Sequence, residues 1–231
     1  RGAGMEEESV WLLPRSIERR DGGGPVWIRQ GAVGDVGCVV WDAAIVLAKY
    51  LETDAFRLRG GEGERSCLRG RRVLELGAGT GAVGLVAASC GAYVTLTDLP
   101  QFMDLIETNI KDNSALLKGR AQAKVLEWGK SIEEFLPHPD YILMADCIYY
   151  EQSLEPLVRT LGALSGPNTL VICCYEERTA GRNPLIQSRF IQLIEQEFEV
   201  EKIPVENHDQ EFCSDDINIL HLRKNVPKVP T

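Results

Sequence analysis

A glycine-rich loop, residues 77–81 (GAGTG), directly follows the apolar run 73–76 (VLEL), and a helical pattern begins at Ala82. A strand that leads through glycines into a helix places backbone without side chains at a helix N-terminus, on the carboxyl edge of a sheet. The glycines allow a tight turn and the close approach of a ligand. This arrangement predicts an α/β fold with a cofactor crevice at the loop.

The alternation of short apolar runs and helical patterns from residue 72 onward is typical of βαβ units in a mostly parallel sheet. The end of the chain departs from this rhythm, because two apolar runs are separated by a polar loop, and we expect an antiparallel pair at the sheet edge. The prediction is a Rossmann-like, seven-stranded α/β fold. The predicted strands are 72–76, 93–97, 121–126, 141–145, 169–175, 199–205 and 217–223, and the predicted helices are 82–90, 101–113, 154–164 and 184–197.

We expect the N-terminal part of the chain to pack on this core as an extension. It contains a predicted strand at 26–30, after a glycine-rich turn, and an amphipathic helix at 41–51. Residues 52–70 are rich in arginine and glycine and lack periodicity, which predicts an exposed loop. The predicted parts are the extension, the core and a C-terminal tail, at residues 5–71, 72–223 and 224–231.

Composition excludes several classes of partner. The 231 residues carry a net charge of −9, which repels a phosphate backbone, so we expect no nucleic-acid substrate. No apolar stretch approaches the roughly 18 residues of a membrane span, and no signal pattern precedes the chain's first predicted strand.

The seven cysteines form no CxxC motif and lie mostly in apolar runs, which indicates reduced thiols in a cytoplasmic protein. His138, His208 and His221 are far apart, and we expect no metal site.

The glycine loop alone leaves the cofactor open. Gly77, Gly79 and Ala82 also satisfy the dinucleotide pattern GxGxxG/A, and Asp98 follows about 20 residues later, as that pattern requires. A carboxylate at the end of 93–97 can accept the hydroxyls of a ribose in either NAD or S-adenosylmethionine enzymes. An NAD-dependent oxidoreductase is therefore one alternative, and a noncatalytic binding module that keeps the cofactor fold is another.

Several further motifs favour a methyltransferase. Together they resemble the seven-β-strand protein-lysine methyltransferases of the methyltransferase-like group, over a region from about Gly34 to Arg223. The resemblance implies a methyltransferase fold, S-adenosyl-L-methionine as cofactor and N-methylation of lysine in a protein substrate. Within the group it is strongest to enzymes that act on valosin-containing protein, a hexameric AAA ATPase, and we expect a monomer. The motifs are 37–44 (GCVVWDAA), 73–81, Trp128, 143–149 (LMADCIY), 172–176 (ICCYE) and Asn183-Pro184.

The resemblance also implies roles for the loop residues. Gly77, Ala78 and Gly79 would lie along the methionine and ribose portions of the cofactor, and Asp98 would bind the ribose hydroxyls. Glu75 would support the loop, although a structural salt bridge is the alternative.

Two tryptophans and Ala145 complete the implied cofactor site. Trp128 would lie beside the adenine, since a flat indole can cover a flat base. Trp41 would also contact the cofactor. The alternative for each tryptophan is an ordinary place in the core.

Asp146 and Tyr149 are the predicted catalytic residues. A strand end followed by Asp-x-x-Tyr can present oxygen acceptors at the methyl sulfonium of the cofactor. A lysine amine, with a reference pKa of about 10.4, must lose a proton before it attacks carbon. We expect Asp146 to orient the substrate ammonium and Tyr149 to line its channel and contact the cofactor. The alternative is a helix-capping Asp146 with Tyr149 in the core.

Overall fold

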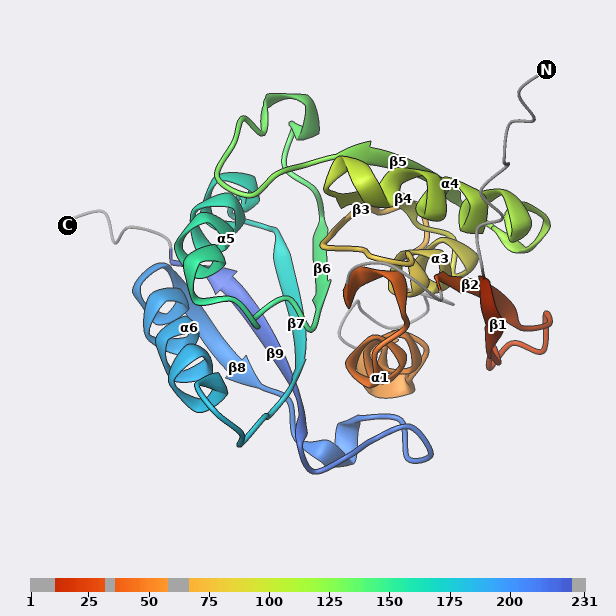
Figure 1. Cartoon of the computed structure of the whole chain (residues 1–231). Coiled ribbons are helices and arrows are strands. Elements are labelled where there is room, and N and C mark those ends of the chain that lie inside the picture. Colours follow the sequence, from red (N-terminus) through yellow and green to blue (C-terminus); the bar gives the residue numbers. More distant parts are fainter. Residues whose placement is uncertain (1–10, 32–35, 58–66, 226–231) are drawn as a thin grey trace, which may run out of the picture.

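The computed structural model describes residues 11–31, 36–57 and 67–225 of the chain. One seven-stranded sheet forms its centre (Figure 1). Its strands are β3 (Arg72–Leu76), β4 (Tyr93–Asp98), β5 (Arg120–Val125), β6 (Tyr141–Ala145), β7 (Leu170–Glu176), β8 (Phe198–Lys202) and β9 (Ile217–Lys224).

The strand order across the sheet is β5-β4-β3-β6-β7-β9-β8. The first five of these strands are parallel, whereas β9 runs antiparallel to both of its neighbours, β7 and β8. The predicted seven-stranded, mostly parallel Rossmann-like fold with an antiparallel pair at one edge is therefore confirmed. The strand that reverses direction is β9, which lies one place in from the edge.

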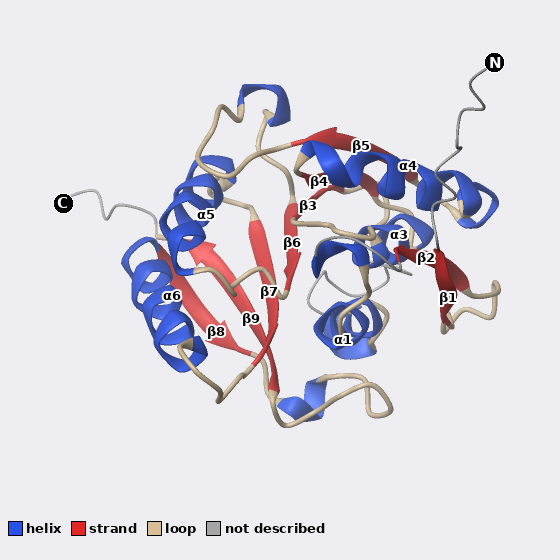
Figure 2. Cartoon of the chain, in the orientation of Figure 1, coloured by secondary structure: helices blue, strands red, loops and turns tan. Residues whose placement is uncertain are grey.

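Helices cover both faces of the sheet (Figure 2). On one side lie α1 (Asp42–Tyr50), α3 (Ala82–Ser89) and α4 (Met103–Asp112), and on the other lie α5 (Glu151–Leu164) and α6 (Asn183–Glu197). Every residue of α3 is buried, which fits its uniformly apolar sequence, because the helix is enclosed by the sheet and by other elements.

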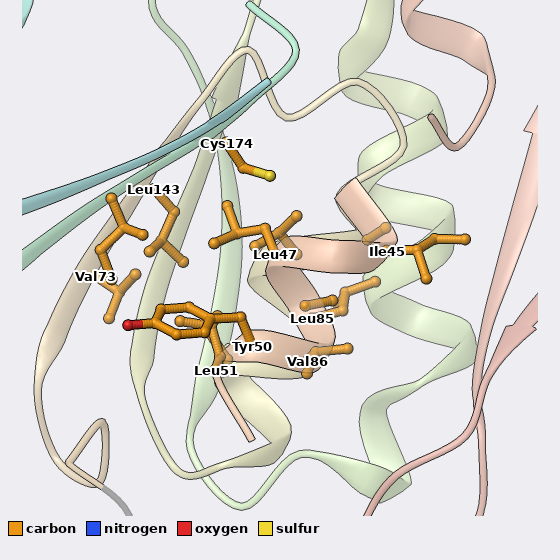
Figure 3. Close-up of a cluster of buried hydrophobic side chains, with 14 of the residues drawn as sticks. Ile45, Leu47, Tyr50, Leu51, Val73, Leu85, Val86, Leu143 and Cys174 are labelled. Carbon is orange, nitrogen blue, oxygen red and sulfur yellow. The ribbon is translucent and has the colours of Figure 1, made fainter. Parts of the chain in front are cut away.

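The core strands are apolar on both faces because both faces are covered. Successive side chains alternate between two hydrophobic clusters, so Val73 joins the cluster on the α1 and α3 side while Leu74 joins the one on the α5 and α6 side. Figure 3 shows part of the first cluster, with Leu47 of α1 and Leu143 of β6 among its side chains. The rigid centre of the sheet thereby fixes the loops that follow β3, β4 and β6.

The first described elements form a hairpin of β1 (Trp11–Ile17) and β2 (Val26–Gly31). The sequence predicts β2 but not β1, which contains Pro14 and has a register shift between Leu12 and Arg15. Two buried amides, Asn109 of α4 and its C-cap residue Asn113, exchange hydrogen bonds of 2.7–3.1 Å with the backbone of β2. These amides pair the open edge of β2 and attach the extension to the core.

The prediction that residues 52–70 form an exposed loop is wrong at both ends of that segment. A short helix, α2 (Asp54–Arg57), carries Phe56, which is only 1% exposed, and Cys67 and Leu68 are also buried. The Phe56 ring lies 5.3 Å from the ring of Tyr50, centroid to centroid. A four-residue helix is too short to show periodicity in the sequence. Residues 58–66 of the predicted loop lie outside the described residues.

Within the part of the chain that the structure describes, no helix combines the length and apolar character that crossing a membrane requires.

Candidate functional site

A cavity of about 370 Å³ lies at the carboxyl ends of β3, β4 and β6. Its size falls within the roughly 300–1,000 Å³ that small-molecule sites occupy. The structure brings all ten predicted site residues to its walls, while the role of each residue stays a prediction. These residues are Trp41, Glu75, Gly77, Ala78, Gly79, Asp98, Trp128, Ala145, Asp146 and Tyr149.

The glycine loop at the base of the cavity requires glycine at two positions. Gly77 and Gly79 have φ values of 60° and 54°, which L side chains rarely adopt. A Cβ on Gly79 would lie 2.6 Å from the backbone oxygen of Gly37, and one on Gly77 would lie 2.8 Å from Cys147 Sγ. The loop therefore lies between Gly37 on one side and Cys147, just after β6, on the other, with no room for a side chain at either glycine. Bare backbone at this place suits the close approach of a cofactor.

Asp98, the last residue of β4, holds the loop in place. One of its carboxylate oxygens accepts a 2.7 Å hydrogen bond from the backbone N–H of Gly79, and the other accepts one of 2.7 Å from Leu99. Each carboxylate oxygen can accept further hydrogen bonds. The predicted contact with ribose hydroxyls is therefore compatible with this structural role.

Glu75 is buried beneath the loop and accepts a 2.9 Å hydrogen bond from the backbone N–H of Gly84 in α3. Its partner is thus a backbone donor of the following helix rather than the cation of the salt-bridge alternative. Burial raises the pKa of Glu75 to about 8, and the negative charge of Asp98 adds to the shift. A carboxyl group that ties β3 to α3 fits the predicted support of the loop.

The two tryptophans reach the cavity from different elements. Trp128 follows β5 and is partly buried, and its ring lies near the position that a Cβ on Gly77 would take. Trp41 is the N-cap residue of α1 and is 40% exposed, with its indole N–H donating a 2.8 Å hydrogen bond to the Val36 oxygen. This exposure argues against a core position for Trp41.

Asp146 follows β6 with a φ of 55°, and it is the one residue other than glycine with positive φ in the described part of the chain. Its backbone N–H donates a 2.8 Å hydrogen bond to the oxygen of Cys174. Its carboxylate accepts hydrogen bonds from the backbone N–H of Glu176 at 3.1 Å and from Arg178 Nη2 at 2.6 Å. Three hydrogen bonds thus hold Asp146 in an unusual backbone conformation. Residues in such conformations cluster at functional sites.

The surroundings of Asp146 shift the pKa of its carboxyl group in opposite directions. Burial raises the pKa of the carboxyl group, while the Glu176 N–H and the Arg178 guanidinium act to lower it, and the net direction is upward. The helix-capping alternative does not hold, because α5 begins at Glu151 with Tyr150 as its N-cap residue.

An aromatic pair lies between Asp146 and α5. The rings of Tyr149 and Tyr150 are 4.5 Å apart, centroid to centroid, and inclined by 58°. Both residues line the cavity, and Tyr150 is 48% exposed. The cavity therefore has an aromatic wall that reaches the solvent.

Sequence reasoning missed several residues of the site. Arg178, in the loop after β7, is the most important of them, because it contacts the predicted catalytic residue Asp146. The signal that could have found it is topological, because β6 and β7 are parallel neighbours and their carboxyl ends must lie side by side. Residues that line the cavity and have no predicted role include Val36, Val39, Leu99, Phe102, Cys147, Tyr150 and Pro156.

Residues 22–197 match a family model described as lysine methyltransferase. The chain belongs to this family. Membership decides between the two cofactors that the glycine loop left open, in favour of S-adenosylmethionine. The residues around the cavity fit this cofactor, since they provide a glycine cradle, the Asp98 carboxylate and the indole of Trp128.

Curated relatives carry the corresponding names. Protein N-lysine methyltransferase METTL21A of Mus musculus is 39% identical over 170 residues, which cover 73% of this chain and 71% of that protein. METTL21A of Danio rerio is 36% identical, with 77% and 73% covered. Protein-lysine methyltransferase METTL21E of Bos taurus is 35% identical, and here the match covers 72% of this chain but only 55% of the relative.

Solved structures support the fold alone. The 16S rRNA N2 G1207 methyltransferase RsmC of T. Thermophilus, solved with AdoMet and guanosine, superposes with a TM-score of 0.58 at 20% identity, over 94% of this chain and 51% of that one. A TehB-like SAM-dependent methyltransferase from Corynebacterium glutamicum gives a TM-score of 0.53 at 16% identity, over 82% and 90% of the two chains.

Proposed function

We propose that this chain transfers a methyl group from S-adenosylmethionine to the side-chain nitrogen of a lysine in another protein, and that this protein is valosin-containing protein. The observation that carries the proposal is the placement of Asp146. Its buried carboxylate lies at the wall of the same cavity as the glycine loop, where a cationic acceptor can be oriented beside the methyl donor.

The acceptor chemistry suits this wall. A lysine ammonium has a reference pKa of about 10.4 and must release its proton to solvent water before the nitrogen can attack carbon. The carboxylate of Asp146 orients the incoming ammonium by a charge-assisted hydrogen bond. The low-dielectric surroundings that raise the pKa of Asp146 also favour the neutral amine.

Positioning accounts for much of the expected rate. When bound, S-adenosylmethionine supplies an electrophilic methyl group on a positively charged sulfur. The glycine loop, Asp98 and Trp128 would hold S-adenosylmethionine, while Tyr149 and Tyr150 would pack along the aliphatic part of the lysine and exclude water. Nitrogen, carbon and sulfur must lie nearly in line, and rigid strand ends are suited to hold that geometry.

The choice of valosin-containing protein rests on motifs rather than on the cavity. Residues 37–44, 143–149 and 172–176 resemble the members of the group that act on this ATPase. In the structure, residues 37–44 contact the glycine loop and lead into α1, while 143–149 and 172–176 form the ends of β6 and β7. Residues of 37–44 and 143–149 line the cavity, and 172–176 belong to the strand that pairs with β6.

The test is transfer of an isotope-labelled methyl group into a cell extract, followed by identification of the labelled protein and residue. We expect label on a lysine of valosin-containing protein. Label on lysine of a different protein would refute the substrate but keep the activity. If S-adenosylhomocysteine binds and no protein gains label, the noncatalytic binding module is favoured.

We also propose that the protein acts as a cytoplasmic monomer. All seven cysteines, which lie within the described residues, are thiols, and this suits a reducing compartment. Cell fractionation tests the location, and light scattering after size-exclusion chromatography tests the oligomeric state.

A further inference from the structure

Arg178 connects three segments that meet beside the cavity. Its guanidinium donates hydrogen bonds of 2.6 Å to Asp146 at the end of β6 and of 3.1 Å to Glu176 at the end of β7. The same group lies 5.2 Å from the ring centroid of Trp41, at the start of α1. Two of its three partners, Trp41 and Asp146, line the cavity, whereas Arg178 is not among the lining residues.

We propose that Arg178 is a positioning residue, which fixes Asp146 and Trp41 as the acceptor-side wall of the cavity. This inference rests on the proposed methyl transfer and extends it to a residue outside the cavity lining. Arg178 acts through its partners and contacts neither the methyl donor nor the acceptor.

The geometry suits an arginine better than a lysine. A planar guanidinium can donate to two carboxylates in its own plane while its face stacks on an indole, and an ammonium group cannot do both. The Arg178 side chain is 25% exposed and that of Asp146 only 5%, so the pair is shielded from solvent on the Asp146 side. Loss of one partner from such a pair leaves the other charge buried and uncompensated.

The remaining contacts of Asp146 show why Arg178 is needed. The Glu176 N–H and Arg178 engage different oxygens of the carboxylate. The hydrogen bond from the Glu176 N–H holds Oδ1 of Asp146, and the bond from Arg178 holds Oδ2. Together they fix the rotation of the carboxylate about its bond to the rest of the side chain. The titratable groups that interact with this carboxylate are Glu176, Arg178 and the thiols of Cys147, Cys173 and Cys174. Arg178 is the one cation in this set.

A second arginine of the same loop provides a matched control. Arg182 forms an exposed ion pair with Glu151, at 2.5 Å, and is not among the residues that line the cavity. Arg182→Gln removes the same charge from the same loop without touching Asp146 or Trp41.

The first measurement is a double-mutant cycle in kcat for methylation of purified valosin-containing protein. We expect Arg178→Gln to lower kcat by about 10- to 100-fold, with a much smaller change in the KM for S-adenosylmethionine, because a small misplacement of reacting groups costs that much. Arg178→Lys should give an intermediate kcat, and Arg182→Gln the wild-type value. The double variant with Asp146→Asn should be as slow as Asp146→Asn alone, since both changes disable the same group. Wild-type kcat in Arg178→Gln, or additive effects in the cycle, would overturn the inference.

The second measurement needs no substrate. The carboxyl carbon of Asp146, assigned by its absence from Asp146→Asn, is followed by NMR through a pH titration. We expect its pKa to rise in Arg178→Gln and to stay unchanged in Arg182→Gln, because Arg178 favours the ionised form. If the wild-type protein methylates nothing, the proposed function fails, and this titration still decides the inference. An unchanged pKa in Arg178→Gln would refute the role of Arg178 whatever the activity.

Discussion

Gly79→Ala should disable the cofactor loop, and the structure allows the size of the effect to be worked out. A Cβ at this position meets the backbone oxygen of Gly37 at 2.6 Å, and backbone cannot rotate away as a side chain could. The φ of 54° costs an L residue about 1–2 kcal/mol. Relief of the clash by backbone movement costs about 1–3 kcal/mol more. The free energy of unfolding should therefore fall by about 2–5 kcal/mol in total.

The same movement should weaken cofactor binding. The N–H of Gly79 donates to Asp98 at 2.7 Å, and a hydrogen bond to a charged group contributes about 1.5–3 kcal/mol. Its loss corresponds to an affinity for S-adenosylhomocysteine that is about 10- to 100-fold lower. Isothermal titration calorimetry measures the affinity, and urea denaturation measures the stability.

Gly22→Ala is the matched control for this variant. Gly22 has a φ of 70°, but a Cβ there has no atom within 4 Å, so only the backbone term of about 1–2 kcal/mol applies. We expect unchanged affinity in this control. If Gly79→Ala binds S-adenosylhomocysteine as tightly as the wild type and loses no more stability than Gly22→Ala, the account of the loop is refuted.

Three other variants test separate parts of the structure. Asp98→Asn should lower the affinity for S-adenosylhomocysteine by about 10- to 100-fold in calorimetry. The reason is that an amide has one acceptor oxygen for the two backbone N–H groups that Asp98 binds, and unchanged affinity would contradict it. Glu75 has its pKa raised from 4.5 to about 8, so the folded state binds its proton more tightly and wild-type stability should fall as pH rises through that window. Glu75→Gln should flatten this fall in denaturant titrations at pH 5 to 8, by at most about 1.4 kcal/mol per pH unit, and an equal slope in both proteins would count against the assigned burial. Phe56→Ala should lower the free energy of unfolding by about 3–5 kcal/mol, whereas a loss below about 1 kcal/mol would restore the exposed loop.

The sheet could be predicted closely because its strands are buried on both faces. The predicted bounds of β3 and β6 agree with the structure residue for residue, since a glycine loop ends the first apolar run and Asp146 ends the second. The hairpin strand β1 escaped prediction because Pro14 interrupts its pattern. Phe56 was missed for a different reason, since its burial depends on Tyr50 and Tyr141, which local periodicity does not reveal.

The residues of the site also divide into those that the sequence could predict and those that it could not. The glycine loop and Asp98 follow from topology, because the carboxyl ends of adjacent parallel strands meet at one edge. Trp41 could be placed only by resemblance, since it reaches the cavity from a segment before the sheet. The pairing of β6 with β7 could bring the loop of Arg178 near Asp146, but the contact of the Arg178 guanidinium with Asp146 depends on three-dimensional packing that the sequence does not reveal.

The central claim is that the cavity of Asp146 and the glycine loop carries out methyl transfer to lysine. The most direct measurement is the intact mass of purified valosin-containing protein after incubation with S-adenosylmethionine and either the wild-type chain or Asp146→Asn. Asparagine tolerates the positive φ of this position and keeps its shape, so the fold should survive. We predict mass increments of whole methyl groups on lysine with the wild type and a far slower rise in mass with the variant, while both bind S-adenosylhomocysteine. Equal methylation by the two proteins would contradict the account.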